Sequence, residues 1–531
     1  MSTASATVVA LVVLSAAGLV PVAAATGPRW VAVPLAPLGG AVVAAVAATA
    51  SLSFGGSLLV WFLGLAAAAG GIVVVLVARR RDLGPWRRRS GRRMAVDRLR
   101  LVGIVGFAAV VSACAWSLRG LRTPTVGFDA RALWVMRPGW FLQSHAQLLV
   151  DMKARGLVLT QSAYPPLVSA AAAVAWRVTG VHTARLGVTT VAVLNACALA
   201  AAALALVECG RVAAVRLSEA RDGGTGEARP GRHAEGAGWP DAATGPTGSP
   251  PWAPMLCGVV AGVLLVPVTA GVTEPFLTNG YADPLWSLAA VGATAFGLQS
   301  RPDRSTRTAT VVLILVAGLT KDEGLVMALA LIALVAARSI GVAGLRGDWR
   351  RWWGPMALGA AEVAVLAWWP VLMRVIGARG ATTTFTTSTA TGSRVSAVVH
   401  GMSPYLHVLV LALPLAVLGG VALSAARRRV ELGHDLWAWL ALAVGLVAVG
   451  GALVTGTGAI EPWIRSTVHR ITEYPILQGW WIVAVWAVAA SCGSVVDRGV
   501  AVPGSPDARD DRREGRDGRD VPSGAPVGAS T

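Results

Sequence analysis

The chain has 531 residues, of which 55% are hydrophobic and only 14% are charged, and its mean hydropathy is +0.61. A soluble globular protein of this length does not have that balance, so the composition predicts a polytopic membrane protein. The net charge of +18 could suggest nucleic acid as a partner, but the arginines stand in short runs beside apolar stretches. That pattern is typical of cytoplasmic loops that anchor membrane helices, so no nucleic-acid partner is expected.

Apolar stretches of about 17 to 25 residues are long enough to cross the hydrocarbon core of a bilayer as helices. Thirteen apolar stretches of this sequence, several of them shorter, are interpreted as membrane helices, so the predicted fold class is an all-α membrane bundle. They cover residues 6–25, 35–52, 58–77, 101–118, 186–207, 252–270, 284–298, 308–320, 325–337, 354–375, 405–425, 436–454 and 476–496.

The placement of arginines predicts the orientation of the chain in the plasma membrane. Segment 79–100 holds ten arginines and should be cytoplasmic. The basic segments further along can share its side only if the chain crosses the membrane an odd number of times between residues 118 and 211. The apolar stretch 165–178 has 14 residues, which is short for a span, so we predict that it lies in or dips into the outer leaflet.

This orientation divides the chain into three parts. Residues 1–100 form N-terminal membrane helices and a basic cytoplasmic loop, residues 101–496 form the main membrane domain, and residues 497–531 form a cytoplasmic tail. The tail and the cytoplasmic loop 218–251 are rich in small and charged residues and are predicted to be disordered. The outward-facing loops are 119–164, 273–283, 321–323, 378–404 and 455–474.

The first outer loop, residues 119–164, contains the candidate catalytic residue, Asp129. Apolar residues recur in this loop at helical spacing, which predicts amphipathic helices lying at the membrane interface. Such helices would hold Asp129 near the bilayer surface, where apolar surroundings raise the pKa of a carboxylate and suit it to act as a general base. Alternatively, Asp129 caps the helix that follows it, and the two roles are compatible. The apolar residues are Phe128, Leu133, Trp134, Trp140, Phe141, Leu148 and Leu149.

Two acidic or basic positions at later helix junctions are further candidates. Asp283 directly precedes a membrane helix, where it either caps the helix or orients a substrate hydroxyl or a metal. Lys321 is one of only two lysines in the chain and lies between two apolar segments. An ionisable group at membrane depth favours a functional role, here the binding of a lipid phosphate. The alternative is an internal charge pair between Lys321 and Glu323 or Asp322.

The last outer loop carries basic residues on the side of the membrane where the positive-inside rule disfavours them. Arg465, His469 and Arg470 precede the final predicted helix. They are interpreted as contacts to a phosphate or pyrophosphate, or else as a solvated rim.

Four short motifs together resemble the bacterial GT-C glycosyltransferases, in residue type and in order. They are Gly127-Phe128-Asp129-Ala130-Arg131-Ala132-Leu133-Trp134, Tyr164-Pro165-Pro166-Leu167, Thr278-Asn279-Gly280-Tyr281-Ala282-Asp283 and Leu319-Thr320-Lys321-Asp322-Glu323-Gly324. The branch with a membrane domain like that of the dolichyl-phosphate-mannose mannosyltransferases is the most similar. The resemblance covers about residues 101–496.

This resemblance implies a GT-C-type bundle, a polyprenyl-phosphate sugar donor, an outward-facing active site and an inverting transfer to a glycan, lipid or protein acceptor. It implies Asp129 as the catalytic base, and a divalent cation, if one is used, at Asp129 and Asp283. The substrate-binding candidates are Arg131, Tyr164, Asp283, Lys321, Glu323, Arg465, His469 and Arg470. Of these, Tyr164 also has a simpler interpretation as part of a rigid turn with Pro165 and Pro166.

Two other function classes compete with this interpretation. A transporter or flippase of lipid-linked or anionic substrates would also have many helices and intramembrane charges. It should place those charges near the middle of the membrane, whereas this sequence places its candidates on one face. A scaffold protein would leave Asp129 and Lys321 without a role.

Overall fold

The computed structural model describes residues 1–26, 31–79, 130–131, 136–153, 163–222, 279–299, 304–344, 352–378, 394–404, 433–455 and 470–482, with a few isolated positions between them. In this part of the chain every regular element is a helix. The all-α prediction is therefore confirmed for the described residues. The predicted spans 101–118 and 252–270, and most of 405–425 and 476–496, lie outside them.

The observed helices agree with the predicted spans wherever both are described, although several are longer. Four of them are long and apolar enough to cross a membrane, judged by length and composition: α2, α14 and the portions Ala184–Ala205 of α9 and Asp322–Gly341 of α13. The elements are α1 Thr3–Thr26, α2 Ala32–Phe54, α3 Leu58–Arg79, α6 Arg137–Trp140, α7 His145–Lys153, α8 Leu167–Thr179, α9 Ala184–Asp222, α11 Asp283–Thr294, the π-helix η6 Ala295–Gln299, α12 Arg304–Thr320, α13 Asp322–Gly344, α14 Trp353–Ile376 and α16 Gly433–Thr455.

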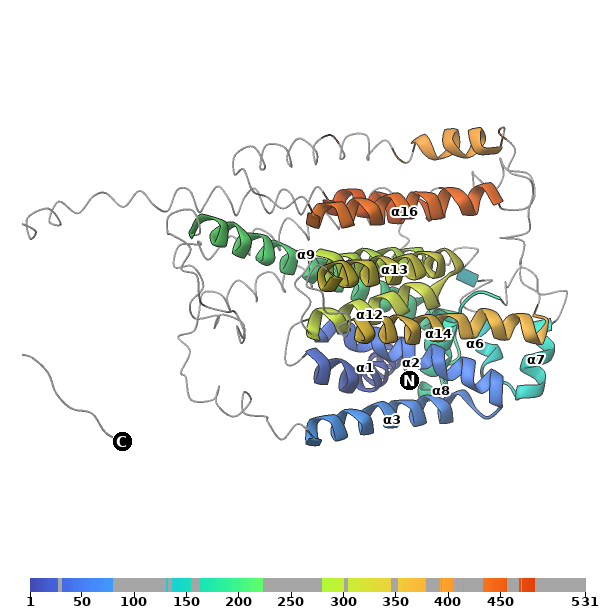
Figure 1. Cartoon of the computed structure of the whole chain (residues 1–531). Helices are drawn as coiled ribbons and strands as arrows, with labels where there is room; N and C mark the ends of the chain where they lie inside the picture. The colour runs from blue at the N-terminus through green and yellow to red at the C-terminus, as the bar shows by residue number, and fades with distance from the viewer. Residues whose placement is uncertain are drawn as a thin grey trace, which may run out of the picture.

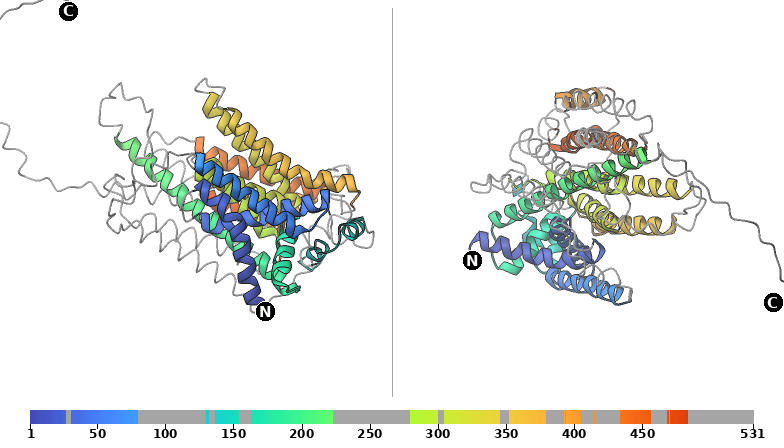
Figure 2. Two further views of the ribbon diagram at one scale, coloured as in Figure 1. Left: turned by 90° about the horizontal axis from the view of Figure 1, so that it is seen from below. Right: turned by 90° about the vertical axis from the view of Figure 1, so that its left-hand side faces the viewer.

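The long helices lie side by side with their axes roughly aligned, and the short helices α6 and α7 lie at one end of the bundle (Figures 1 and 2). Small residues allow the close approach of neighbouring helices. A Cβ on Gly40 of α2 would overlap the Leu14 carbonyl of α1, and a Cβ on Gly18 would overlap the Ala36 carbonyl. Such small-residue contacts are typical of helix pairs in membranes, where packing replaces the hydrophobic effect as the driving force.

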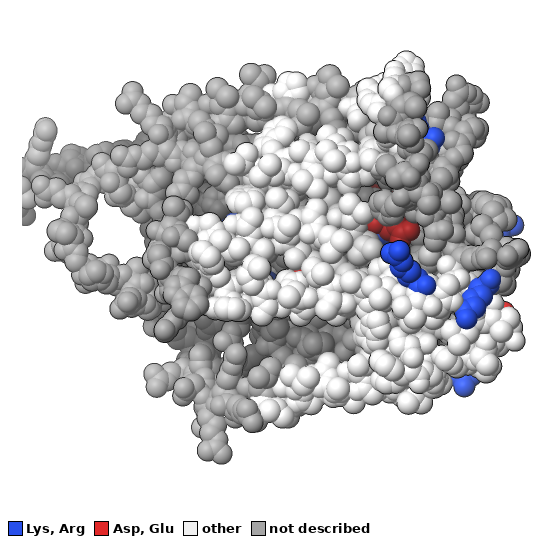
Figure 3. All heavy atoms as spheres, turned by 45° about the vertical axis from the view of Figure 1, so that its right-hand side comes forward, with Lys and Arg blue, Asp and Glu red and all other residues white. Residues whose placement is uncertain are grey.

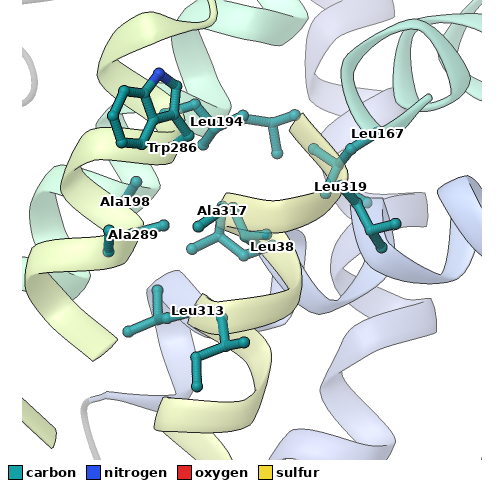
Figure 4. Close-up of a cluster of buried hydrophobic side chains, with 14 of the residues drawn as sticks. Leu38, Leu167, Leu194, Ala198, Trp286, Ala289, Leu313, Ala317 and Leu319 are labelled. Atoms are coloured by element: carbon teal, nitrogen blue, oxygen red, sulfur yellow. The ribbon is translucent and has the colours of Figure 1, made fainter. Parts of the chain in front are cut away.

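Figure 4 shows part of the core, where buried side chains of α2, α8, α9, α11 and α12 meet. The same buried cluster also includes residues of α1, α3, α13, α14 and α16. Leu313, Ala317 and Leu319 of α12 are at most 2% exposed. They belong to the same buried cluster as Trp286 of α11 and Leu38 of α2. This packing brings the start of α11 and the end of α12 together.

Helices α9 and α11 run in the same direction. Asn195 of α9 donates a hydrogen bond to the Tyr281 carbonyl just before α11, and Cys209, further along α9, donates to the Ala295 carbonyl just after it. The end of α9 and the start of α11 therefore lie at opposite ends of the bundle. The sequence predicts a single membrane span between them, at 252–270. A single span would place the end of α9 and the start of α11 on opposite sides of the membrane.

Further contacts define two ends of the bundle. At one end, hereafter the Arg338 end, Arg338 of α13 donates a 2.6 Å hydrogen bond to the Gly297 carbonyl of η6. At the other, hereafter the Lys321 end, lie the α12–α13 turn and the start of α11. The predicted cytoplasmic Arg338 and the predicted outer-loop residues thus occupy opposite ends, as the arginine pattern requires.

Two features were predicted after residue 119, namely amphipathic helices in loop 119–164 and a short apolar segment at 165–178. The structure has a helix in each place, α7 and α8. Helix α7 is amphipathic, since it buries Leu148 and Met152 and exposes Gln147 and Lys153. Helix α8 has 13 residues, about 20 Å at 1.5 Å per residue, which is too short to span a bilayer. It ends at Gly180, whose φ of +67° favours glycine. Residues 167–176 are buried among α1, α2 and α9, so α8 is enclosed in the bundle.

Candidate functional site

An ion pair between Lys321 and Asp283 occupies the Lys321 end of the bundle. The Lys321 Nζ donates to Asp283 Oδ1 at 2.7 Å, and the two side chains are 4% and 3% exposed. The N-cap of α11 is Ala282, and it makes no side-chain capping bond. Asp283 lies one position inside the helix and directs an oxygen to Lys321. Two residues that the sequence presented as separate candidates are thus in direct contact.

The α12–α13 turn determines where Lys321 points. Helix α12 ends at Thr320, α13 begins at Asp322, and the Leu325 amide donates to the Lys321 carbonyl at 2.8 Å. Glu323 Oε1 lies 3.5 Å from Lys321 Nζ, so the internal charge pair is also present. Acidic residues in the first turn of α13 are favourable there because the N-terminus of a helix carries partial positive charge.

Gly324 allows this turn to pack against its neighbours. A Cβ at this position would overlap the Ala317 carbonyl of α12 and would lie 3.0 Å from the Cβ of Trp286 on α11. Glycine is therefore required by the close approach of three helices, and that approach holds Lys321 beside Asp283.

Burial and charge act in opposite directions on Lys321. Burial lowers the pKa of the ammonium group, but the neighbouring Asp283 and Glu323 carboxylates more than offset this, so the pKa of Lys321 is raised above 10.5. Lys321 is therefore charged at neutral pH. An ammonium group has three donors. Asp283 takes one and Glu323 lies within ion-pair distance, which leaves a donor for an anionic ligand.

Arg470 brings a second cation to the same end from far along the chain. Its guanidinium carbon lies 4.9 Å from the centre of the Tyr281 ring, a cation–π contact. Arg470 is 8% exposed and close enough to Lys321 for its charge to lower the pKa of that residue. Backbone hydrogen bonds from Thr472 to Val468 and from Ile476 to Thr472 show that this segment is helical.

The loop 279–282 is shaped by its contacts with α9 and with residue 130. Tyr281 donates its amide to Asn279 Oδ1, and Asn195 donates to the Tyr281 carbonyl. Gly280 has φ +88°, and a Cβ there would lie 2.9 Å from the Cβ of Ala130. Ala130, which follows Asp129 in the sequence, is fully buried. The second outer loop therefore packs against the motif of the first.

Glu473 lies beside the ion pair and is 2% exposed. Neither carboxylate oxygen has a hydrogen-bond partner among the described residues. Burial raises the pKa of this carboxyl well above 4.5, the Asp283 carboxylate raises it further, and Lys321 lowers it. Glu473 falls within the predicted last outer loop, 455–474, and is not among the predicted site residues. The adjacent Tyr474 contacts both α16 and α11, since its hydroxyl donates to the Ala441 carbonyl at 3.4 Å and its ring stacks on Trp286 with 5.8 Å between ring centres.

Arg137 is a fully buried cation that sequence reasoning missed. It lies in α6 and donates a 2.8 Å hydrogen bond to the carbonyl of Tyr164. Burial lowers its pKa to about 10, while the nearby Asp322 raises it, so it stays charged at neutral pH. Trp369 of α14 donates to the neighbouring Ala163 carbonyl at 2.8 Å. These two contacts hold the end of the first outer loop at the Lys321 end of the bundle. A single arginine in a sequence segment with nearby tryptophans does not predict them.

The structure brings together part of the predicted set of site residues. Asp283, Lys321, Glu323 and Arg470 converge, and Tyr164 contributes its backbone carbonyl through Arg137. Arg131 is exposed. Asp129, Arg465 and His469 lie outside the described residues.

On the face drawn in Figure 3, most of the visible charge of the described residues gathers towards one end, where acidic and basic side chains meet, and little charge is visible on the rest of that face. Within the described ranges no group of three or more His, Cys, Asp or Glu side chains is arranged to hold a metal ion. Comparisons with models of protein families, with curated proteins and with solved structures gave no match.

Proposed function

We propose that this protein is an integral-membrane glycosyltransferase of the plasma membrane. It transfers a sugar from a polyprenyl-phosphate donor to a cell-envelope acceptor on the outer face, with inversion. The observation that carries the proposal is the convergence of Lys321, Asp283, Arg470 and Glu473, from three distant parts of the chain, at one end of an apolar helical bundle. The order of the GT-C-like motifs supports it.

A lipid-linked donor suits this arrangement physically. The prenyl chain would lie along the part of the face in Figure 3 where little charge is visible, and its phosphate would reach the charged end. Two cations close together are suited to a phosphate, because hydrogen bonds between charged groups are about twice as strong as neutral ones. A transporter should carry its functional charges near the middle of the bundle, whereas Asp283, Lys321, Arg470 and Glu473 lie together at one end.

In the proposed reaction, the oxygen of an acceptor hydroxyl attacks the anomeric carbon of the sugar while Asp129 takes the hydroxyl proton. The bond between that carbon and the phosphate oxygen breaks, and its electron pair leaves with the polyprenyl phosphate. Lys321 and Arg470 stabilise the negative charge that gathers on the departing phosphate. Asp283 and Glu323 hold the Lys321 ammonium group in place, so no reorganisation is needed at the moment of transfer.

The proposal is tested with Asp129→Asn and a matched control, Asp151→Asn. Asn and Asp cap helices about equally well, so Asp129→Asn retains capping and removes the base. Asp151 lies in the same outer loop on α7, where Gln147 donates to it. Loss of a positioned base lowers the rate by about 100- to 10,000-fold.

Both variants are purified, reconstituted in liposomes and assayed for donor binding and for sugar transfer. We expect Asp129→Asn to bind donor normally and to lose transfer by that factor, and Asp151→Asn to retain both. Near-normal transfer by Asp129→Asn would show that the base is another residue. Absence of donor binding and transfer by the wild-type protein would contradict the glycosyltransferase proposal.

A further inference from the structure

Glu473 is a buried carboxyl group without a hydrogen-bond partner among the described residues. It is 2% exposed and lies near Asp283 and Lys321. A buried polar group that makes no hydrogen bond destabilises a protein, and a buried carboxyl does so whether charged or neutral. An apolar side chain of similar size would be more stable at this position. A glutamate at this position is therefore suited to a hydrogen bond that a ligand supplies.

The neighbours of Glu473 indicate what this ligand is. Arg470 lies three residues earlier in the same segment, and both residues lie near Lys321, since Arg470 lowers the pKa of Lys321 and Lys321 lowers the pKa of Glu473. Arg470 carries a positive charge beside Lys321, whereas Glu473 offers two hydrogen-bond acceptors. One ligand reaching both residues would carry an anion next to a hydrogen-bond donor.

We propose that Glu473 accepts a hydrogen bond from a hydroxyl of the sugar on the lipid phosphate, while Arg470 binds the phosphate. Glu473 is thereby a residue that distinguishes the glycosylated lipid from the bare polyprenyl phosphate. This inference rests on the proposed function. It adds that the donor's sugar lies against the segment 470–482, beside the Asp283–Lys321 ion pair.

Stability and binding should change in opposite directions when Glu473 is replaced. In Glu473→Leu the unpartnered carboxyl is gone, so the unfolding temperature in detergent should be equal to or higher than that of the wild type. Glu473→Gln keeps the shape and one acceptor, and serves as a second variant should Glu473→Leu fail to fold. A large loss of stability in both variants would show that Glu473 has a structural partner within the chain, and would overturn the inference.

Binding is measured with two probes, undecaprenyl phosphate and a panel of its mannosyl, glucosyl and arabinosyl esters. For the ester that the wild type binds most tightly, Glu473→Leu should weaken binding by about 10- to 150-fold, the range for a lost hydrogen bond to a charged group. Binding of undecaprenyl phosphate should be unchanged. Arg470→Ala should weaken the binding of both lipids.

Glu362→Leu is the matched control. Glu362 is also a buried glutamate, 7% exposed, but it lies on α14, about 10 Å along the helix from Trp369 towards the Arg338 end. We expect this control to leave both affinities unchanged. Equal effects of Glu473→Leu on the two lipids, or no effect on either, would overturn the inference while leaving the glycosyltransferase proposal intact. A wild-type protein that binds neither lipid would overturn both.

Discussion

Replacing both members of the Asp283–Lys321 ion pair with apolar residues should disturb the fold less than replacing Lys321 alone. The pair is buried, with an Nζ–Oδ1 distance of 2.7 Å. Removing one partner of a buried pair leaves an uncompensated charge, at a cost of about 3 to 5 kcal/mol. Replacing both partners by apolar groups of similar volume is often neutral or stabilising by about 1 to 4 kcal/mol.

The two single variants should differ from each other. Lys321→Met leaves the Asp283, Glu323 and Glu473 carboxylates together without the central ammonium group, so it should cost the full amount of about 3 to 5 kcal/mol. Asp283→Leu leaves Lys321 with Glu323 at 3.5 Å. That remaining partner should limit the loss to about 1 to 3 kcal/mol.

The assay is a double-mutant cycle of unfolding in mixed detergent micelles at pH 7, followed by the fluorescence of the 21 tryptophans. A coupling free energy of about 2 kcal/mol or more is expected between the two positions. Asp151→Ala on α7 removes an exposed hydrogen bond and should change the unfolding free energy by no more than about 0.5 kcal/mol. Strictly additive losses, or a larger loss for Asp283→Leu than for Lys321→Met, would refute the reasoning.

The remaining predictions concern packing, pH and topology. Gly324→Ala should destabilise the protein in thermal unfolding because its Cβ would overlap the Ala317 carbonyl. At Gly341, on the same helix, a Cβ would meet nothing within 4 Å, so Gly341→Ala should be neutral or stabilising by up to about 1 kcal/mol. Burial raises the pKa of Glu473, so the folded state holds that proton more tightly and stability falls as pH rises above 4.5. Glu473→Gln should therefore stabilise more at pH 8 than at pH 5. In a background without native cysteines, Cys at 153 should react with an impermeant label from outside and Cys at 218 only after permeabilisation; the reverse result would contradict the orientation.

Sequence reasoning was sufficient for the class of fold and for the approximate positions of many helices. Apolar runs long enough to cross a bilayer are a strong local signal, because backbone groups in lipid must be hydrogen-bonded within a helix. The break at Lys321 was visible for the same reason: a charge between two apolar runs interrupts them. Amphipathic spacing likewise pointed to the buried Leu148 of α7, whereas Met152, the other buried residue of this helix, was not among the predicted apolar residues.

Which candidates meet was decided by tertiary structure. Asp283 and Lys321 are 38 positions apart, and no local pattern pairs them. Their contact depends on the packing of α11 against α12 and α13, which Gly324 permits. The sequence predicted for Lys321 either the binding of a phosphate or an internal charge pair with Glu323 or Asp322. It did not include Asp283 among the possible partners.

Arg137 and Glu473 illustrate the same limit. Both read in the sequence as ordinary polar residues of outer loops, and both are buried in the fold. Arg137 of α6 donates to the Tyr164 carbonyl, and Trp369 of α14 donates to the Ala163 carbonyl. Tyr474, next to Glu473, stacks on Trp286. The burial of a residue depends on contacts with residues that are distant in the sequence. The residues next to it in the sequence therefore do not reveal it. The sequence determined that this protein carries charged groups among apolar helices. The packing of those helices decided which charges are paired and which carboxyl is buried without a hydrogen-bond partner among the described residues.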